Sequence, residues 1–80
     1  MRQKKPTLFF SFSTTEGAMA AESVCREHGI PGRLVPVPRE ITAGCGLAWM
    51  SEPEQKETIL AFFREQKLAY EGCHLMEFYR

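Results

Sequence analysis

The sequence shows no excess of charge of either sign, since Lys plus Arg and Asp plus Glu number ten each among 80 residues. The basic residues are also scattered along the chain and form no stripe. Such a chain produces no overall field that would attract a polyanion. We therefore expect no nucleic-acid partner.

A long hydrophobic run is also missing. The most apolar stretch, Leu8 to Phe12, is interrupted by Ser11 and is much shorter than the ~20 residues of a membrane-spanning helix. It is also too short for the core of a secretory signal, although Lys4 and Lys5 precede it. We therefore expect no membrane partner and a cytoplasmic location.

Cysteine is scarce, and its spacing matches no known framework. Cys25, Cys45 and Cys73 are widely separated, with no C-x-x-C and no paired His spacing. An odd number of distant cysteines argues against a disulfide framework and against a closed zinc site. The sequence predicts at least one free thiol, no metal and no cofactor.

The apolar content of 44% and the charged content of 25% are typical of a globular chain. The length predicts a single domain over residues 1–80, with residues 1–6 as a polar tail. A domain of this size buries only about 60–65% of its unfolded surface, so its core needs most of the large apolar residues. We expect any chemistry on a rim or loop, outside an enclosed cavity.

An alternating pattern predicts the first strand over residues 7–12. Leu8 and Phe10 lie on one face and Phe9 on the other, and aromatic residues on both faces indicate a central strand. Pro36 cannot donate to a sheet ladder, which places the second strand at an edge. The remaining strands are expected over residues 33–37, 46–50 and 73–79.

Two segments carry helix signals. Ser13 followed by Glu16 is typical of a capping box and predicts a helix over residues 14–28, ended by Gly29. Ser51 as a cap, with a proline in the first turn, predicts a second helix that runs to about residue 67. The apolar stripes expected to be buried are Ala20, Ala21, Val24, Cys25 and His28 in the first helix, and Lys56, Ile59, Leu60, Phe62 and Phe63 in the second.

The element order βαββαβ predicts an α+β fold of the ferredoxin-like type. In that fold two helices cover one face of a four-stranded antiparallel sheet of strand order 4-1-3-2. This order places Pro36 on an edge strand and the aromatic first strand in the middle, so the local signals agree with the topology.

The predicted topology gathers four segments at one end of the sheet: the end of strand one, the start of helix one, the loop before strand three and the start of strand four. The chemistry-bearing residues there are Ser13, Thr14, Thr15, Arg39, Gly44, Cys45, Gly46, Gly72, Cys73 and His74. Cys45 has the most suggestive setting of the three thiols. A helix amino terminus and a guanidinium both favour a thiolate, and flanking glycines leave the sulfur open to a partner.

Each of these residues has a structural alternative. Cys45 could simply fill a tight turn, Cys25 is expected in the core, and Cys73 could be packed or presented. Cys45 and Cys73 are expected two strand spacings apart, about 9–10 Å, so a disulfide between them would need the loop to fold over. His74 could be a proton shuttle or a packed side chain, and Arg39 could be a solvated loop residue.

The block Pro36-Val37-Pro38-Arg39-Glu40-Ile41 that leads to Cys45-Gly46, together with Ser13-Thr14-Thr15-Glu16, resembles the selenium/sulfur carrier protein-like family. The resemblance is closest over residues 9–48. It implies that Cys45 carries the sulfur or selenium atom and that Arg39 is its companion in the motif. It also implies sulfur or selenium donor and acceptor proteins as partners.

Three functions follow from these observations. The first is a sulfurtransferase-like carrier that holds the atom on Cys45 as a persulfide or selenosulfide. The second is a non-catalytic binding or regulatory module that acts through pairing of the exposed last strand, including pairing into a homodimer. The third is RNA recognition, which this topology also serves, but residues 46–50 supply one aromatic residue and no charge.

Overall fold

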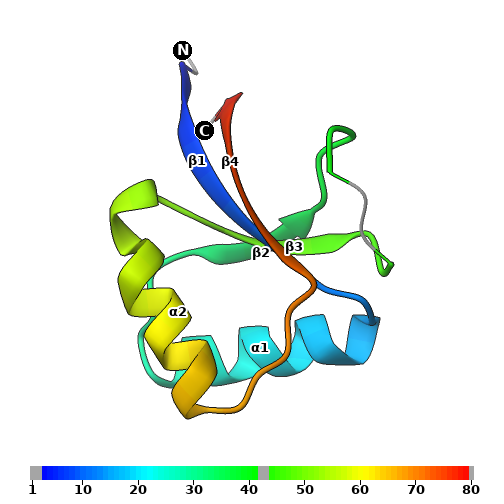
Figure 1. Ribbon diagram of the computed structural model, residues 1–80, viewed down its shortest axis with the longest axis vertical. Coiled ribbons are helices and arrows are strands. Elements are labelled where there is room, and N and C mark those ends of the chain that lie inside the picture. The colour runs from blue at the N-terminus through cyan, green and yellow to red at the C-terminus, as the bar shows by residue number, and fades with distance from the viewer. Residues whose placement is uncertain (1–2, 42–43, 80) are drawn as a thin grey trace.

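The computed structural model describes residues 3–41 and 44–79. Its elements are β1 (Lys4–Ser11), α1 (Thr15–Glu27), β2 (Arg33–Pro36), β3 (Leu47–Ser51), a 3-10 turn (Pro53–Gln55), α2 (Lys56–Glu65) and β4 (Gly72–Tyr79). The strands form one antiparallel sheet of order β2-β3-β1-β4, as Figure 1 shows. The ferredoxin-like α+β fold and the strand order 4-1-3-2 are therefore confirmed.

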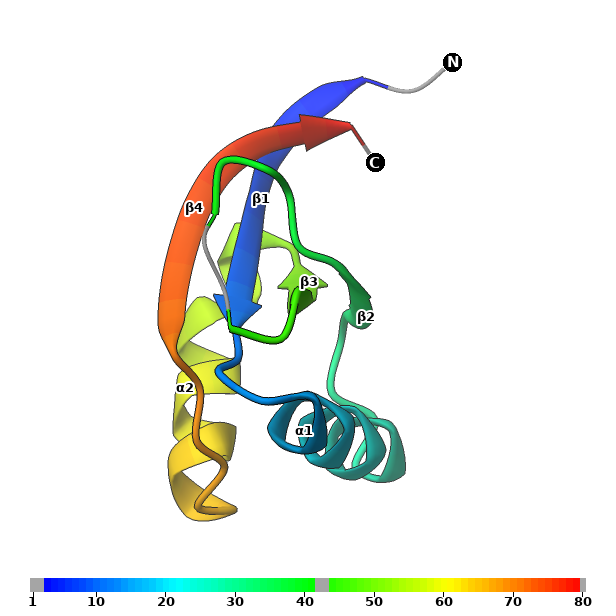
Figure 2. The ribbon, with the colours of Figure 1, turned by 90° about the vertical axis from the view of Figure 1, so that its right-hand side faces the viewer.

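Both helices pack against the same face of the sheet (Figure 2). Side chains from β1, β3, α1 and α2 meet there in one buried cluster, which we call the helix-side core. Its members are Leu8, Phe10, Phe12, Ala18, Ala21, Cys25, Trp49, Ile59, Phe62 and Phe63. Removing this much aromatic and aliphatic surface from water supplies most of the driving force for folding.

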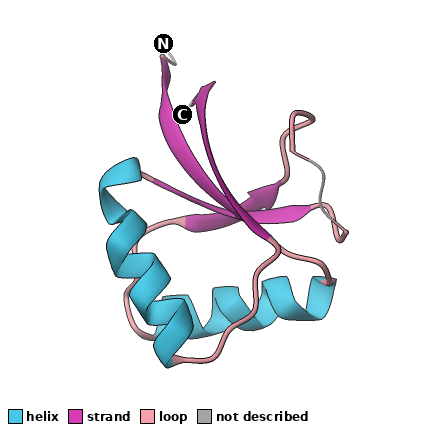
Figure 3. Cartoon of the chain, viewed as in Figure 1, coloured by secondary structure: helices cyan, strands magenta, loops and turns pink. Residues whose placement is uncertain are grey.

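The opposite face of the sheet carries a second, smaller core. Phe9, Ala48 and Met50 are buried there together with Ile41. Ile41 belongs to the loop between β2 and β3, which is drawn in pink in Figure 3. Val37 of the same loop also packs on this face. Val37 and Ile41 therefore fix the first part of the loop on the outer face of the sheet. The predicted two-sided burial of β1 is confirmed by Phe9.

Helix α1 begins one residue later than predicted. Thr14 is the cap, because its Oγ1 accepts a hydrogen bond of 3.0 Å from the Gly17 amide. The predicted pair of Ser13 and Glu16 is therefore not the capping motif. The prediction that Ala20 is buried is wrong, since Ala20 is exposed and Ala18 is buried. Ala18 lies three residues before Ala21 and seven before Cys25, which places it on the same helix face as these two buried residues.

The end of α1 matches the prediction. Gly29 has a φ of 69°, and the amide of Ile30 donates to the Cys25 carbonyl at 2.9 Å. This bond, together with that from the Gly29 amide to Arg26, is the pairing that satisfies the last carbonyls of a helix. His28 is largely exposed, although its ring lies 5.2 Å from that of Phe62 on α2.

The predicted cap at Ser51 is wrong. Ser51 is the last residue of β3, where it pairs with Leu8, and its hydroxyl donates to the Glu52 carbonyl at 3.2 Å. A short 3-10 turn follows, so α2 begins at Lys56, which is exposed. The expected stripe on α2 is otherwise present, with Ile59, Phe62 and Phe63 buried and Leu60 half-buried.

The predicted polar tail, residues 1–6, is too long, because β1 already begins at Lys4. Lys4, Lys5 and Pro6 belong to β1 and pair with the last three residues of β4. Proline is tolerated there because β3 pairs with β1 only from Leu8 onward, so this part of β1 has a single neighbour. Pro36, in contrast, lies on the edge strand β2 as predicted.

We predict that Gly32→Ala destabilises the domain by at least about 2 kcal/mol. Gly32 has a φ of 125°, and a Cβ there would lie 2.5 Å from both the Met50 carbonyl oxygen and Trp49 Nε1. Gly29→Ala is the matched control, because φ is 69° but no atom lies within 4 Å of the added Cβ. That variant should lose only about 1 kcal/mol. Urea unfolding measures both, and equal losses would contradict the packing explanation.

Candidate functional site

The structure brings together the end of β1, the start of β4 and the second half of the loop between β2 and β3. This loop comprises residues 37–46, and we call it the Cys45 loop. Ser11 pairs with Ala48 of β3 on one side and with Gly72 of β4 on the other. Gly44 lies against the chain just beyond β1, since a Cβ on it would be 2.5 Å from the Ser13 carbonyl oxygen. The predicted convergence of these segments at one end of the sheet is therefore observed.

Glu71 joins the Cys45 loop to the start of β4. Its Oε1 accepts a hydrogen bond of 3.3 Å from the Gly44 amide, and its own amide donates to the Ser11 carbonyl at 2.6 Å. Sequence reasoning missed this residue. The contact joins positions 27 residues apart, and a lone glutamate before a strand carries no local signal for it.

The other side of the loop is also anchored. The amide of Val37 donates to the Gly46 carbonyl at 2.9 Å, and Gly46 has a φ of 76°. The left-handed conformation at Gly46 is one that residues with side chains rarely adopt. Cys45 therefore lies between two glycines whose backbones are both held by hydrogen bonds.

The Cys45 side chain is half-buried against the helix-side core, and its thiol is free. Its Sγ donates to the Leu47 carbonyl oxygen at 3.8 Å, a weak hydrogen bond of the kind a thiol can form. The loop thus positions the thiol without supplying a described cation against it.

Arg39 lies apart from this arrangement. It is exposed in a turn closed by the hydrogen bond from the Ile41 amide to the Pro38 carbonyl, and Ile41 packs on the outer face of the sheet. Cys45, in contrast, contacts the core on the helix side. Within the described chain, Arg39 makes no hydrogen bond or ion pair.

The amino end of α1 is exposed at Ser13, Thr14 and Thr15. One of its amides, that of Gly17, is already satisfied by the Thr14 hydroxyl. The Ala18 amide donates to the Thr14 carbonyl at 3.1 Å. Gly44 lies against the backbone of Ser13, the residue before the cap. The helix start is therefore a neighbour of the loop, as the topology predicted.

Cys73 and His74 lie on opposite faces of β4. Cys73 is half-buried against the helix-side core, and burial raises the pKa of its thiol although the positive charge of Lys56 works against this rise. His74 Nε2 lies 3.4 Å from Ser11 Oγ. Because successive strand residues alternate, His74 points away from the face that Cys45 contacts.

Cys25 is fully buried in α1, as predicted. Its burial raises the pKa of the thiol from the ordinary value of 9.0 to about 11. Desolvation disfavours the charged form of the sulfur, so this thiol is a poor nucleophile at neutral pH. The core role expected for Cys25 is confirmed.

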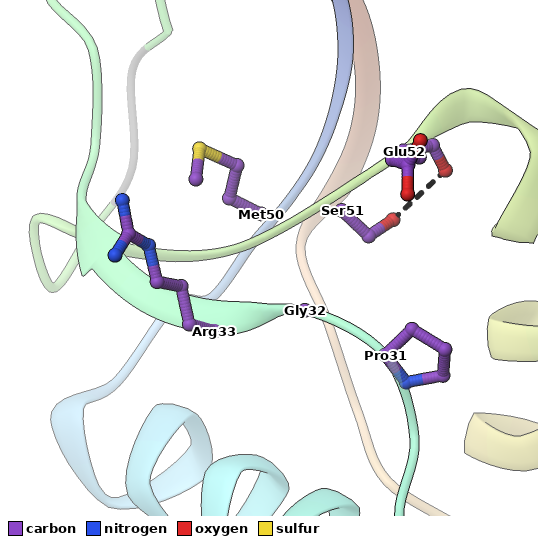
Figure 4. Close-up of a pocket in the computed structure, with 6 residues that line it drawn as sticks. All are labelled: Pro31, Gly32, Arg33, Met50, Ser51 and Glu52. Atoms are coloured by element: carbon purple, nitrogen blue, oxygen red, sulfur yellow. Dashed lines mark hydrogen bonds between the residues drawn. The ribbon is translucent and has the colours of Figure 1, made fainter. Parts of the chain in front are cut away.

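A shallow hollow of about 260 Å³ lies between the start of β2 and the end of β3 (Figure 4). It is lined by Pro31, Gly32, Arg33, Met50, Ser51 and Glu52. Cys45 precedes β3, whereas this hollow lies where β3 ends, and a five-residue strand spans roughly 17 Å. The hollow is therefore not a substrate cavity for the Cys45 sulfur.

We predict that the three thiols react with iodoacetamide in the order Cys45, Cys73, Cys25. Burial raises the pKa of the Cys25 and Cys73 thiols, which lowers the fraction of reactive thiolate. Cys25 should react at least ~100-fold more slowly than an unperturbed thiol, because its pKa is about 11. Peptide mass spectrometry of the native protein at timed intervals measures the order. Unfolded protein, in which all three should react alike, is the control. Equal native rates at Cys45 and Cys73 would contradict the prediction.

The buried Cys25 thiol also predicts a loss of stability in alkali. Above pH 9 the unfolded chain releases this proton while the folded chain keeps it until about pH 11, so unfolding is favoured as pH rises. The loss should reach about 2–3 kcal/mol. Urea unfolding of the wild type and of Cys25→Ala isolates this contribution, because other titrating groups are common to both. A stability difference between the two that is the same at pH 7 and pH 11 would refute it.

Two further observations concern residues 3–41 and 44–79. In the described residues no helix is long and apolar enough to cross a membrane. Within the same residues, no three His, Cys, Asp or Glu side chains are grouped to hold a metal ion.

The family described as "Putative Se/S carrier protein-like" matches residues 7–75 of the chain. No curated protein matches the sequence, and no solved structure matches it either. The family match extends from β1 through α1, the Cys45 loop and α2 into β4, and so includes every segment of the site described above. The chain therefore belongs to this family of selenium/sulfur carrier-like proteins.

Proposed function

We propose that this protein carries a sulfur or selenium atom on Cys45 and passes it between two other proteins. The observation that supports this proposal best is the contrast among the three thiols. Burial raises the pKa of the Cys25 and Cys73 thiols. Cys45, which is half-buried like Cys73, lies on an anchored loop between two exposed glycines. Membership of the selenium/sulfur carrier-like family supports sulfur or selenium as the atom carried.

The proposed loading step is a thiol exchange. The Cys45 sulfur, once deprotonated, attacks the outer sulfur of a persulfide on the donor. A bond forms between these two atoms, the donor's sulfur–sulfur bond breaks, and its electron pair leaves on the donor thiolate, which takes up a proton. Cys45 then holds the atom as a persulfide. A donor selenosulfide would load selenium in the same way.

Delivery reverses these roles. A nucleophile on the acceptor attacks the outer atom of the Cys45 persulfide, and Cys45 leaves as a thiolate. No external oxidant or reductant is needed in either step, because the atom is transferred with its oxidation state unchanged. The chemistry requires an accessible sulfur and a docking surface but no deep cavity.

The loop holds the Cys45 sulfur in place at one end of the sheet. Its thiol donates to the Leu47 carbonyl, and the amide of the neighbouring Gly44 donates to the Glu71 carboxylate. The sulfur therefore has a defined position relative to the sheet, and the donor and the acceptor would both dock at this end.

The competing function is a non-catalytic module that binds a partner through the edge of the sheet. The exposure of Leu75 and Tyr79 on the edge strand β4 favours it. In that case Cys45→Ala would bind its partner and support its cellular role as well as the wild type does.

We predict that treatment with a small-molecule persulfide adds one sulfur atom to Cys45. Intact-protein and peptide mass spectrometry would show the added mass, which a thiol reductant should remove. Cys45→Ser should lose at least about nine-tenths of the loading, because a hydroxyl is not a comparable nucleophile for sulfur. Cys73→Ser, which changes the other half-buried thiol, is the control and should load as the wild type does. Loading that is unchanged in Cys45→Ser would end the proposal.

A further inference from the structure

The two edges of the sheet differ in how they are protected from pairing with another strand. The edge strand β2 has only four residues and includes Pro36 and Arg33. Short length, proline and positive charge all discourage strand addition. The edge strand β4 has eight residues, from Gly72 to Tyr79, and contains no proline, lysine or arginine.

Strand β4 is also regular along its whole length. Each of its eight residues is in continuous register with β1, so no bulge twists the edge away from a partner. The N–H and C=O groups that point away from β1 therefore form an uninterrupted row about 27 Å long. These unpaired N–H and C=O groups can form hydrogen bonds with another extended strand.

Exposed apolar side chains gather on the same strand. Leu75 is 65% exposed and Tyr79 is 55% exposed, and Tyr70 lies just before the strand. The only other large hydrophobic side chain that is exposed among the described residues is Met19, on α1. Figure 1 shows that the ends of β1 and β4 near the chain termini extend beyond the helices, so this half of the edge is open to a partner.

We infer that β4 pairs with β4 of a second copy of this chain, antiparallel and about a two-fold axis at Met76. The two sheets would then become one sheet of eight strands, with the helices of both copies on the same face. A formal net charge of zero means that two copies do not repel each other at long range.

Side-chain chemistry selects the register at Met76. A two-fold axis at Glu77 would place two carboxylates directly opposite each other, which is destabilising. An axis at Leu75 would leave Tyr79 beyond the first residue of the partner strand. The axis at Met76 places Glu77 opposite Leu75 and covers the Tyr79 ring with the strand start at Cys73. On the other face it places His74 opposite Phe78.

This dimer is compatible with the proposed carrier function but does not depend on it. Cys45 precedes β3, and β1 separates β3 from β4. The pairing therefore leaves both Cys45 loops uncovered. Cys73, in contrast, becomes shielded by the ring of Tyr79 of the second copy. Only the reactivity of Cys73 should respond to protein concentration.

Sedimentation equilibrium of the wild type tests the inference. A single strand pair is close to the lower limit of about 1,000 Å² for a specific interface, so we expect a dimer that forms in the micromolar range, measured from about 5 to 500 μM. Leu75→Lys and Tyr79→Lys should each weaken the dimer at least tenfold, because a charge on the edge opposes strand addition. Both positions are exposed, so the fold should survive either change.

Met19→Lys is the matched control, since it places the same charge at a similarly exposed apolar residue on α1 and should dimerise as the wild type does. Cys45→Ser should also dimerise normally, which separates this test from that of the carrier function. A wild type that stays monomeric up to 500 μM overturns the inference, as does equal weakening by Met19→Lys and Leu75→Lys.

The register is tested by cross-linking in a Cys45→Ser, Cys73→Ser background. The axis at Met76 brings the two Met76 Cα atoms to about 4.5–5.5 Å, within the range of a disulfide. Met76→Cys should therefore form an oxidised dimer, and Glu77→Cys, which faces Leu75 of the other copy, should not. Cross-linking of Glu77→Cys alone would overturn the proposed register.

Discussion

The burial of β1 on both of its faces is the constraint on which the rest of this small structure depends. Phe10 enters the core beneath the two helices, while Phe9, the adjacent residue, enters the core on the outer face. Both are completely buried. An 80-residue chain has few elements with which to cover two faces of a sheet. The helices cover one, so a loop must cover the other.

The need to cover the outer face of the sheet explains why the loop between β2 and β3 is held in place on both sides of Cys45. Ile41 contributes the apolar cover over Phe9, and a few residues later Gly44 is fixed between Ser13 and Glu71. The first half of the loop thus belongs to the outer core and the second half to the end of the sheet. Cys45 gains its position from packing that has no direct role in chemistry.

Much of the fold could be predicted because its signals are local. The alternation around Phe9, the proline at position 36 and the glycine at position 29 each restrict the backbone in one way, and the structure agrees with all three. The helix starts were predicted less well. Neighbouring hydroxyl residues compete for the cap, and at Ser51 the pairing of β3 with Leu8 prevails over the capping preference.

The site could be predicted only in outline. Topology alone indicated that the loop, the helix start and the last strand converge. The contacts that hold Gly44 and the separation of Arg39 from Cys45 depend on how the loop crosses the sheet, and no sequence period encodes that path. Glu71 could not be identified without the fold, because its partners lie 27 and 60 positions away along the chain.

The hydrogen bond from the Cys45 thiol to the Leu47 carbonyl links the direction of this side chain to the first residue of β3. Strand β3 lies between β2 and β1, so it cannot shift without breaking pairings on both of its sides. An insertion or deletion between Cys45 and Leu47 would therefore turn the sulfur away from its present direction. The sheet itself thus sets the spacing between the cysteine and the strand that follows it.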